Sequence, residues 1–200
     1  RAFAGAGVEI ARCLESDAAP VRHVAVGHHE ADLASALHTA AEPPGTVVSV
    51  DGVGDFLSTQ TARVDGDRLA PTGRVTFPHS LGLLYQAVTQ HLGFPGFGDE
   101  YKVMGLAAHG RAARTDALAS LIRTRPGGRF ELNLRYFRHT RPGFAYRWQG
   151  GAPEVGRLLA PRAAQLLGPP RLPEATIDER HADLAASLQA IYERTLWHVL

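Results

Sequence analysis

Three short segments of the chain combine residue types and spacings that could support chemistry. The first is His28-His29-Glu30-Ala31-Asp32, in which His28 and Asp32 lie four residues apart. If the segment is helical, these two side chains share one face of the helix. An imidazole and a carboxylate form a suitable ligand pair for a divalent transition metal. The same spacing also occurs between neighbours on an exposed helix surface, so both interpretations stay open.

The second segment is Asp51-Gly52-Val53-Gly54-Asp55, directly after the β-branched run 46–50. A carboxylate at the carboxyl end of a buried strand lies where ligands bind in open α/β sheets. Gly52 and Gly54 would let the backbone approach a phosphate or a metal closely. Asp-Gly is also a common turn signal, so an ordinary hairpin is the alternative. The run before Asp51 is apolar on both faces, which favours a turn at the centre of a sheet.

The third segment holds the only lysine of the chain, Lys102, and its only methionine, Met104. All other positive side chains except histidine are arginines, so a retained lysine indicates that a compact, flexible ammonium is needed there. Between a glycine-rich loop and Gly105, this ammonium could pair with a phosphate-like anion. The alternatives are a surface lysine retained by chance and a lysine that caps a short helix.

Composition limits the classes of protein that fit. The 200 residues carry a formal net charge of +1 and no basic run, which argues against a nucleic-acid or membrane-surface partner. The single cysteine, Cys13, excludes an internal disulfide and fits a reducing compartment. No apolar run approaches the roughly 20 residues that a membrane helix needs. We therefore expect a soluble, cytoplasmic protein.

Features at both ends of the chain indicate that it is a piece of a longer protein. Because Met104 is the only methionine, Arg1 is not a translated start. Residues 185–200 read as a helix without a cap or a breaker. We expect an internal fragment with a partial active site.

The spacing of apolar residues and the turn signals predict the elements that must position these segments. The region 138–175, rich in Arg, Gly and Pro, reads as an irregular insertion or a connection between subdomains. The predicted elements are strands at 21–27, 46–50, 56–64, 68–77 and 130–137, and helices at 28–41, 80–92, 112–123, 154–167 and 177–199.

Five motifs follow one another in a characteristic order and together resemble the nodulation-type O-carbamoyltransferases, a family that also acts in antibiotic biosynthesis. The resemblance covers residues 28–189, and the order of the motifs is more specific than any one of them. The motifs are His28-His29-x-x-Asp32-x-x-Ser35-Ala36, Asp51-Gly52-x-Gly54-Asp55, Ser80-Leu81-Gly82-x-Leu84-Tyr85-x-x-x-Thr89-x-x-Leu92-Gly93-Phe94, Lys102-Val103-Met104-Gly105-Leu106-Ala107 and Ala185-Ala186-Ser187-Leu188-Gln189.

The resemblance implies an α/β fold of the actin-like ATPase, ribonuclease-H-like type. Residues 1–200 would form part of the amino-terminal carbamoyltransferase domain, and the YrdC-like domain, absent from this chain, would lie in cis in the full-length protein. That second domain would make carbamoyl adenylate from carbamoyl phosphate and ATP. The first would transfer the carbamoyl group to a hydroxyl of a sugar or natural product, with the help of a divalent metal, expected to be Fe²⁺.

The same resemblance assigns roles to individual residues. A metal can lower the pKa of the attacking hydroxyl or polarise the carbamoyl carbonyl, and a cation can meet the charge of the leaving adenylate. The implied metal ligands are His28, Asp32 and Asp51, the implied catalytic residues are Asp51 and Lys102, and the implied nucleotide-binding residues are Gly52, Gly54, Lys102 and Gly105.

The chain departs from the family pattern in two ways. Family members usually have His-x-x-x-His, whereas the second ligand position here is Asp32, which makes the ligand set harder and could favour a different ion. Family segments that complete the pocket would precede Arg1 and follow Leu200, so we expect the isolated piece to be inactive.

Two other functions fit part of the pattern. A tRNA threonylcarbamoyl transferase would share the metal motif and the glycine turns, but not the segments around Leu84 and Lys102. Its tRNA would also require a basic surface, which a net charge of +1 does not suggest. A truncated, non-catalytic remnant that binds nucleotide or a partner is the alternative outside the enzymes, and Asp32 favours it.

Overall fold

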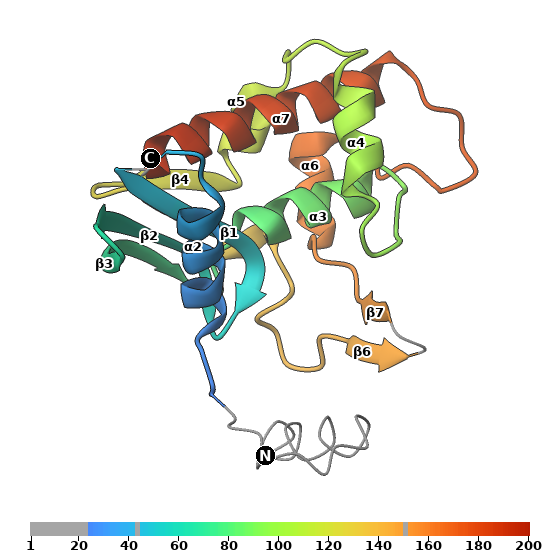
Figure 1. Cartoon of the computed structure of the whole chain (residues 1–200). Coiled ribbons are helices and arrows are strands. Elements are labelled where there is room, and N and C mark those ends of the chain that lie inside the picture. The colour runs from blue at the N-terminus through green and yellow to red at the C-terminus, as the bar shows by residue number, and fades with distance from the viewer. Residues whose placement is uncertain (1–23, 43–44, 150–151) are drawn as a thin grey trace.

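The computed structural model describes residues 24–42, 45–149 and 152–200 (Figure 1). It is a mixed α/β structure whose strands form small antiparallel sheets. The predicted strand at 21–27 is wrong where it can be assessed, because Val24–Gly27 has no regular structure and 21–23 lie outside the described residues. No described helix is both long and apolar enough to cross a membrane.

The main sheet contains three antiparallel strands in the order β1 (Thr46–Gly54), β2 (Leu57–Asp65) and β3 (Arg68–Thr76). Alternating and β-branched residues favour these strands, and the predicted turn between β2 and β3 contains Gly66 at a φ of 59°. The central strand is β2, and β1 has β2 as its only neighbour among the described strands. The prediction that the Asp51 segment lies at the centre of a sheet is therefore wrong.

The Asp51 segment is also not the turn itself. Strand β1 continues through it to Gly54, with an irregular register between Val50 and Gly54. The chain reverses one residue later, at Asp55 and Phe56, which have φ values of 50° and 64°. The irregularity arises because residues 51–53 have no ladder partner on β2, which leaves their backbone free to face other elements.

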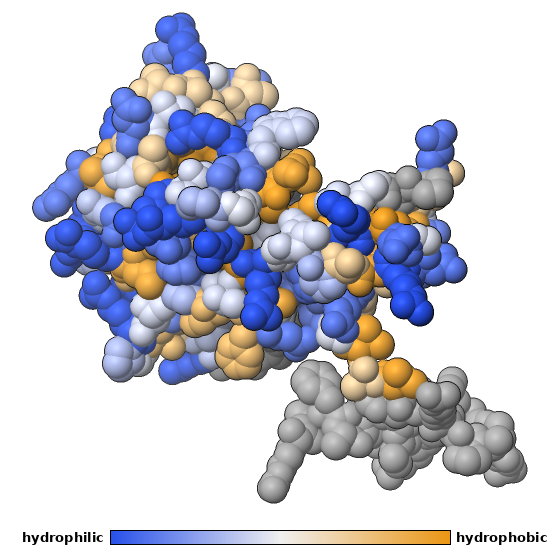
Figure 2. Space-filling view, turned by 90° about the vertical axis from the view of Figure 1, so that its left-hand side faces the viewer, coloured by the Kyte–Doolittle hydropathy of each residue, from blue (hydrophilic) through white to orange (hydrophobic). Residues whose placement is uncertain are grey.

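Helix α2 (His28–Thr39), predicted at 28–41 from its apolar spacing, packs on the sheet, where Leu33 lies against Val47 and Ala62. The face seen from the left of Figure 1 is mainly hydrophilic, with scattered apolar side chains (Figure 2). The small cluster of Leu33, Val47 and Ala62 holds the first residue of α2, His28, close to the end of β1.

A larger core lies among the helices. Helix α3 (Leu81–His91) begins at Ser80, whose Oγ accepts a hydrogen bond from the backbone N–H of Leu83, as expected of an N-cap. It ends before Gly93, which has a φ of 81°. Around α3 pack α4 (Glu100–Ala107), α5 (Thr115–Ala119) and the long α7 (Glu179–Val199), whose predicted extent is confirmed within two residues.

Between α4 and α7, several predicted elements differ from the observed ones. Helix α5 has only five residues, because Ile122 begins strand β4 (Ile122–Arg125), which pairs with β5 (Arg129–Leu132). The strand predicted to reach residue 137 ends at Leu132 and is followed by the 3₁₀ turn η1 (Leu134–Tyr136).

The region 138–175 is more regular than predicted, and the helix predicted at 154–167 is confirmed only over its last part. The hairpin β6 (Tyr146–Gln149)–β7 (Ala152–Val155) comes first, then η2 (Pro161–Ala163) and α6 (Ala164–Leu167). Pro161 supplies no backbone N–H, so a helix starts there and not at Glu154. Leu158, Leu159 and Leu167 are buried in the larger core, so this region is part of the fold.

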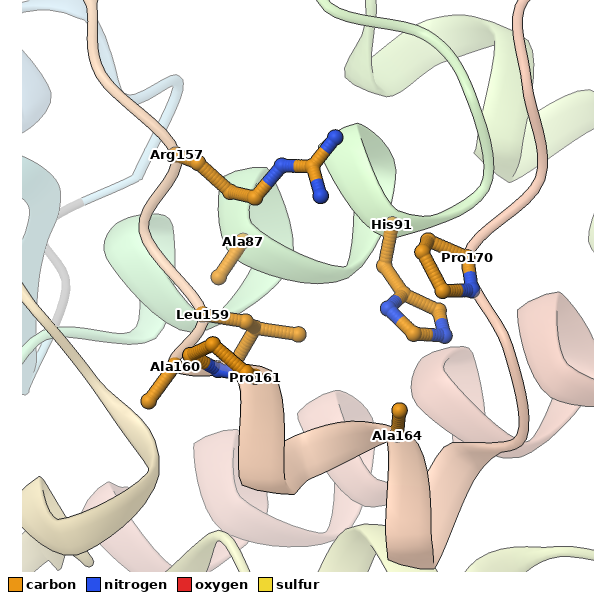
Figure 3. Close-up of a pocket in the computed structure, with 8 residues that line it drawn as sticks. All are labelled: Ala87, His91, Arg157, Leu159, Ala160, Pro161, Ala164 and Pro170. Atoms are coloured by element: carbon orange, nitrogen blue, oxygen red, sulfur yellow. The ribbon is translucent and has the colours of Figure 1, made fainter.

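A small pocket of about 180 Å³ lies between α3 and the segment 157–170. Figure 3 shows the imidazole of His91 beside Pro170, with Arg157 reaching in from the opposite side. His91 is only 8% exposed, and its Nε2 has no hydrogen-bond partner in the described chain. Burial lowers the pKa of His91 to about 4, and the neighbouring charges of Arg180 and Arg157 act in the same direction. The side chain is therefore neutral at pH 7.

We expect Leu188→Ala to lower the free energy of unfolding by about 2–5 kcal/mol, because it opens a cavity in the larger core. Urea denaturation followed by circular dichroism measures this change. Leu172, which is 70% exposed, gives the matched control. Leu172→Ala should change the free energy by less than about 0.5 kcal/mol, and equal losses in both variants would contradict this core.

We also expect His91 to make folding sensitive to acid. Its folded pKa of about 4 lies below the ordinary value of 6.5, so the unfolded state binds more protons as the pH falls. The contribution of neutral His91 to the free energy of unfolding is fully present above pH 6.5. As the pH falls from 6.5 to 4 this contribution is lost, and the free energy of unfolding decreases by about 3 kcal/mol. Denaturation curves at several pH values should show a weaker loss in His91→Gln than in exposed His109→Gln, and identical slopes would contradict this assignment.

Candidate functional site

The structure brings the three predicted metal ligands into one cluster at the start of α2 and the end of β1. Nε2 of His28 lies 2.7 Å from Oδ2 of Asp51 and 3.6 Å from Oδ2 of Asp32. The backbone N–H of His28 donates to Oδ2 of Asp55 over 2.7 Å, which fixes the first turn of α2 to the turn after β1. The imidazole of His28 thus contacts the carboxylate of Asp51, which lies 23 residues further along the sequence.

Two residues that the sequence analysis missed support this cluster. The hydroxyl of Ser49 donates to Oδ2 of Asp32 over 2.7 Å, and it contacts Nδ1 of His29 at the same distance. Because the Ser49 hydroxyl has a single hydrogen, it accepts from Nδ1–H of His29. His29 is buried, and its Nε2 has no partner among the described residues. The signals in the sequence were the paired histidines and a serine within an apolar strand.

The glycines of the Asp51 segment allow close packing. A Cβ on Gly54 would lie 2.1 Å from Cδ2 of His28, so the imidazole occupies the space of a side chain. A Cβ on Gly82, in the first turn of α3, would lie 2.9 Å from Cα of Gly52. Ser80, the N-cap of α3, donates its hydroxyl to the carbonyl of Asp51 over 3.2 Å. The segment is therefore held between two helices, α2 and α3.

Asp51 and Gly52 line two adjoining pockets, which also share Gln86 and Phe97. We call the first, of about 360 Å³, the α7-side pocket, and the second, of about 570 Å³, the hairpin-side pocket. The other residues of the α7-side pocket are Gly82, Tyr85, Gly98, Glu100, Met104, Gln189 and Tyr192. The other residues of the hairpin-side pocket are Val53, Phe77, Leu83, His139, Phe144, Tyr146, Val155 and Leu158.

The wall of the α7-side pocket joins two of the sequence motifs. The hydroxyl of Tyr85 donates to Oε1 of Gln189 over 2.9 Å, across 104 residues of sequence. Burial raises the pKa of Tyr85 to about 12, with smaller contributions from Tyr192, Glu100 and Glu193, so this hydroxyl stays protonated. The Tyr85–Gln189 pair is therefore a neutral part of the wall, and Glu100 adds a carboxyl group to the same pocket.

The structure does not bring Lys102 into the cluster. Its Nζ pairs with Oδ1 of Asp99 at 2.7 Å, and Lys102 lines neither pocket at Asp51. The hydrogen bond with Asp99 raises the pKa of Lys102. Asp99 is the N-cap residue of α4, but its side chain makes no capping hydrogen bond, so the helix-capping alternative is not confirmed. Its neighbours Glu100 and Met104 face the α7-side pocket instead. No atom lies within 4 Å of a Cβ built on Gly105.

The types of donor atom in the cluster suit a metal, but the distance between them is too short. One imidazole and two carboxylates, between 43% and 46% exposed, are ligands that divalent transition metals accept. Two ligands of one ion bound at about 2.1 Å lie about 3 Å apart, however, and Nε2 and Oδ2 are 2.7 Å apart. Within 24–42, 45–149 and 152–200, no group of three or more His, Cys, Asp or Glu side chains is placed to hold an ion. Metal binding therefore requires His28 and Asp51 to separate slightly.

We expect Gly54→Ala to displace His28, because the added methyl group overlaps the imidazole. The free energy of unfolding should fall by about 1–3 kcal/mol, as in other overpacked sites. The matched control is Gly105→Ala in α4, where the methyl group meets open space and should stabilise the helix by about 0.5–1 kcal/mol. Urea denaturation measures both, and a Gly54 variant as stable as the parent would contradict the close packing.

Comparison with known proteins identifies the family. The family model described as "Carbamoyltransferase N-terminus" matches residues 3–200. The chain is 33% identical over 191 residues to the uncharacterized protein sll1178 of Synechocystis, a match that covers 94% of this chain and 28% of that protein.

Two rhizobial proteins are also similar. Nodulation protein NolNO of Sinorhizobium fredii is 32% identical over 184 residues, which are 90% of this chain and 23% of that protein. Nodulation protein NolO of Bradyrhizobium diazoefficiens is 33% identical over 178 residues, which are 88% of this chain and 28% of that protein. The chain thus spans about a quarter of the length of these relatives. It belongs to the carbamoyltransferase family and corresponds to the amino-terminal region of that family.

Proposed function

We propose that the full-length protein carrying this chain transfers a carbamoyl group from carbamoyl adenylate to a hydroxyl of a sugar or natural product. Family membership supports carbamoyl transfer in general. The observation that carries the finer proposal is Asp51, which lines two pockets and lies in a cluster with His28 and Asp32. One pocket can admit the donor and the other the acceptor, with Asp51 between them.

In the proposed reaction, the oxygen of the acceptor forms a bond to the carbamoyl carbon. The bond between that carbon and the phosphate oxygen of the adenylate breaks, and AMP leaves with the electron pair. The proton of the hydroxyl must pass to a base, and Asp51 is a carboxylate that lines both pockets. An adenylate is a good leaving group, so the main task of the site is to orient and deprotonate the hydroxyl.

We propose His28, Asp32 and Asp51 as the residues that would hold a divalent metal, expected to be Fe²⁺. Such an ion would supply Lewis acidity and lower the pKa of the attacking hydroxyl. Ser49 and His29 would orient Asp32 through the hydrogen bonds described above. The actin-like fold, a YrdC-like domain in cis and the supply of the donor from carbamoyl phosphate and ATP belong to the same proposal. The proposal includes no nucleic-acid or membrane partner.

A non-catalytic remnant is the competing function. The short contact between His28 and Asp51 and the pairing of Lys102 with Asp99 favour it, because a metal site would need rearrangement and the expected cation faces elsewhere. Against it stands the opening of Asp51 into two pockets of a size suited to small molecules. The two functions differ in metal content and in turnover.

The full-length protein, purified without oxygen and supplied with Fe²⁺, should bind one metal per active site. His28→Ala and Asp51→Ala should abolish this metal and lower carbamoyl transfer by at least about 100-fold, whereas Ser49→Ala should weaken metal affinity by about 10–100-fold. Asp67→Ala, in the turn between β2 and β3, is the matched control and should keep both properties. Elemental analysis and a transfer assay with carbamoyl phosphate and ATP measure them. A parent protein that neither binds metal nor transfers the group would establish the remnant instead.

A further inference from the structure

A pocket of about 610 Å³, separate from the two at Asp51, lies between β3 and the β4–β5 hairpin, which are both on the left-hand side of Figure 1. It shares no lining residue with the α7-side pocket or the hairpin-side pocket. We call it the arginine pocket, because Arg74 on β3, Arg125 at the end of β4 and Arg129 at the start of β5 all line it. The lining also includes His79 and Glu131.

Two of these arginines are placed against each other in the hairpin. Arg125 and Arg129 are register partners on either side of the turn that contains Gly127 and Gly128. Residues directly opposite each other in an antiparallel pair have Cβ atoms about 4.5–5.5 Å apart, and two like charges at such positions are unfavourable. An anion bound by both guanidinium groups would remove this repulsion.

The single carboxylate in the lining is already engaged. Oε2 of Glu131 accepts hydrogen bonds from Nη2 of Arg125 over 2.9 Å and from Nη2 of Arg123 over 2.8 Å. The hydrogen bonds from Arg125 and Arg123 lower the pKa of Glu131 to about 2, so this side chain is ionised at neutral pH. Neither Arg74 nor Arg129 forms a salt bridge with a carboxylate of a described residue. Positive charge is therefore in excess here, although the net charge of the whole chain is only +1.

His79 adds a further hydrogen-bond donor. Its Nδ1 accepts a hydrogen bond from the backbone N–H of Leu132 over 3.1 Å, so Nε2 carries the hydrogen of the neutral ring. Burial lowers the pKa of His79, although the charge of Glu131 opposes this, and the ring is neutral at pH 7. Three guanidinium groups and one imidazole N–H favour a ligand that is negatively charged and rich in acceptor oxygens.

The arrangement of the arginines favours a phosphate group over a carboxylate. Arg74 belongs to one wall of the pocket, and Arg125 and Arg129 belong to the other. The oxygens of a phosphate point in tetrahedral directions and can accept from both walls, whereas the two oxygens of a carboxylate lie in one plane. The planar fork of arginine also matches two phosphate oxygens at once.

We infer that the arginine pocket binds a phosphate group, either as a free inorganic anion or as part of a phosphate ester, at a site separate from the pockets of the proposed carbamoyl transfer. Asp51 lines those two pockets and does not line this one. A phosphate bound here therefore lies outside the reacting groups, and the inference goes beyond the proposed function and does not depend on it.

Protection of arginines from phenylglyoxal in the full-length protein, located by mass spectrometry of its peptides, tests this inference. Saturating orthophosphate or glycerol 2-phosphate should slow the modification of Arg74 and Arg129 by about 10-fold, because a guanidinium group that is hydrogen-bonded to phosphate is shielded from the reagent. Arg63, an exposed arginine on β2 that does not line the pocket, is the matched control and should react at the same rate throughout. Stronger protection by one of the two compounds identifies the source of the phosphate group, and protection by either supports the inference.

The phosphate concentration that gives half of the protection measures affinity at this pocket alone. Arg74→Ala, monitored at Arg129, and Arg129→Ala, monitored at Arg74, should each raise this concentration by about 10-fold, because each removes a charged hydrogen-bond donor. Glu131→Gln should instead lower it by about 3-fold or more, because the competing negative charge is lost. A merely structural role of the arginines would not produce this gain.

Modification rates of Arg74 and Arg129 that phosphate leaves unchanged overturn the inference. So does an affinity that falls in Glu131→Gln, or one that falls as much in Arg63→Ala as in Arg74→Ala. These results are distinguishable from failure of the proposed function. Carbamoyl transfer could be absent while Arg74 and Arg129 are protected, and it could be present while they are not, since Asp51 lies outside this pocket.

Discussion

The contact between the His28 imidazole and the Asp51 carboxylate joins the two parts of the structure on which the site depends. His28 begins α2, which packs on the three-stranded sheet, and Asp51 lies in the irregular end of β1, which faces α3. Both side chains are partly exposed, so the pair is weak as a stabilising interaction. Its importance is geometric, because it fixes where a carboxylate meets the two pockets.

The packing around this contact explains why small residues surround it. Gly54 leaves room for the imidazole, and the approach of Gly82 to Gly52 brings the N-terminus of α3 against β1. The first turn of a helix carries backbone N–H groups and a partial positive charge, which favours a negatively charged group nearby. A larger side chain at either glycine would separate the helix from the strand that it positions.

The two pockets share one carboxylate but differ in their walls. The α7-side pocket has hydroxyl, amide and carboxylate groups, including Tyr85 and Gln189, which are fixed to each other across α3 and α7. The hairpin-side pocket has aromatic side chains from Phe77, Phe97, Phe144 and Tyr146, and neither pocket has an arginine or a lysine among its lining residues. The two pockets therefore present different surfaces on either side of one shared carboxyl group, that of Asp51.

The sequence by itself determined the elements that depend on neighbouring residues. Helices α2, α3 and α7 and the hairpin from β2 to β3 were predicted from apolar spacing, from Ser80 as a cap and from Gly66 in a turn, because these signals act over a few residues. The ordered motifs also identified the family. Only the tertiary structure decided that β1 is an edge strand of the described sheet, that Lys102 pairs with Asp99, and that Ser49, His29 and His139 surround the site. Those facts depend on which distant segments pack together, and residue spacing along the chain does not encode strand order or the direction in which a side chain finds its partner.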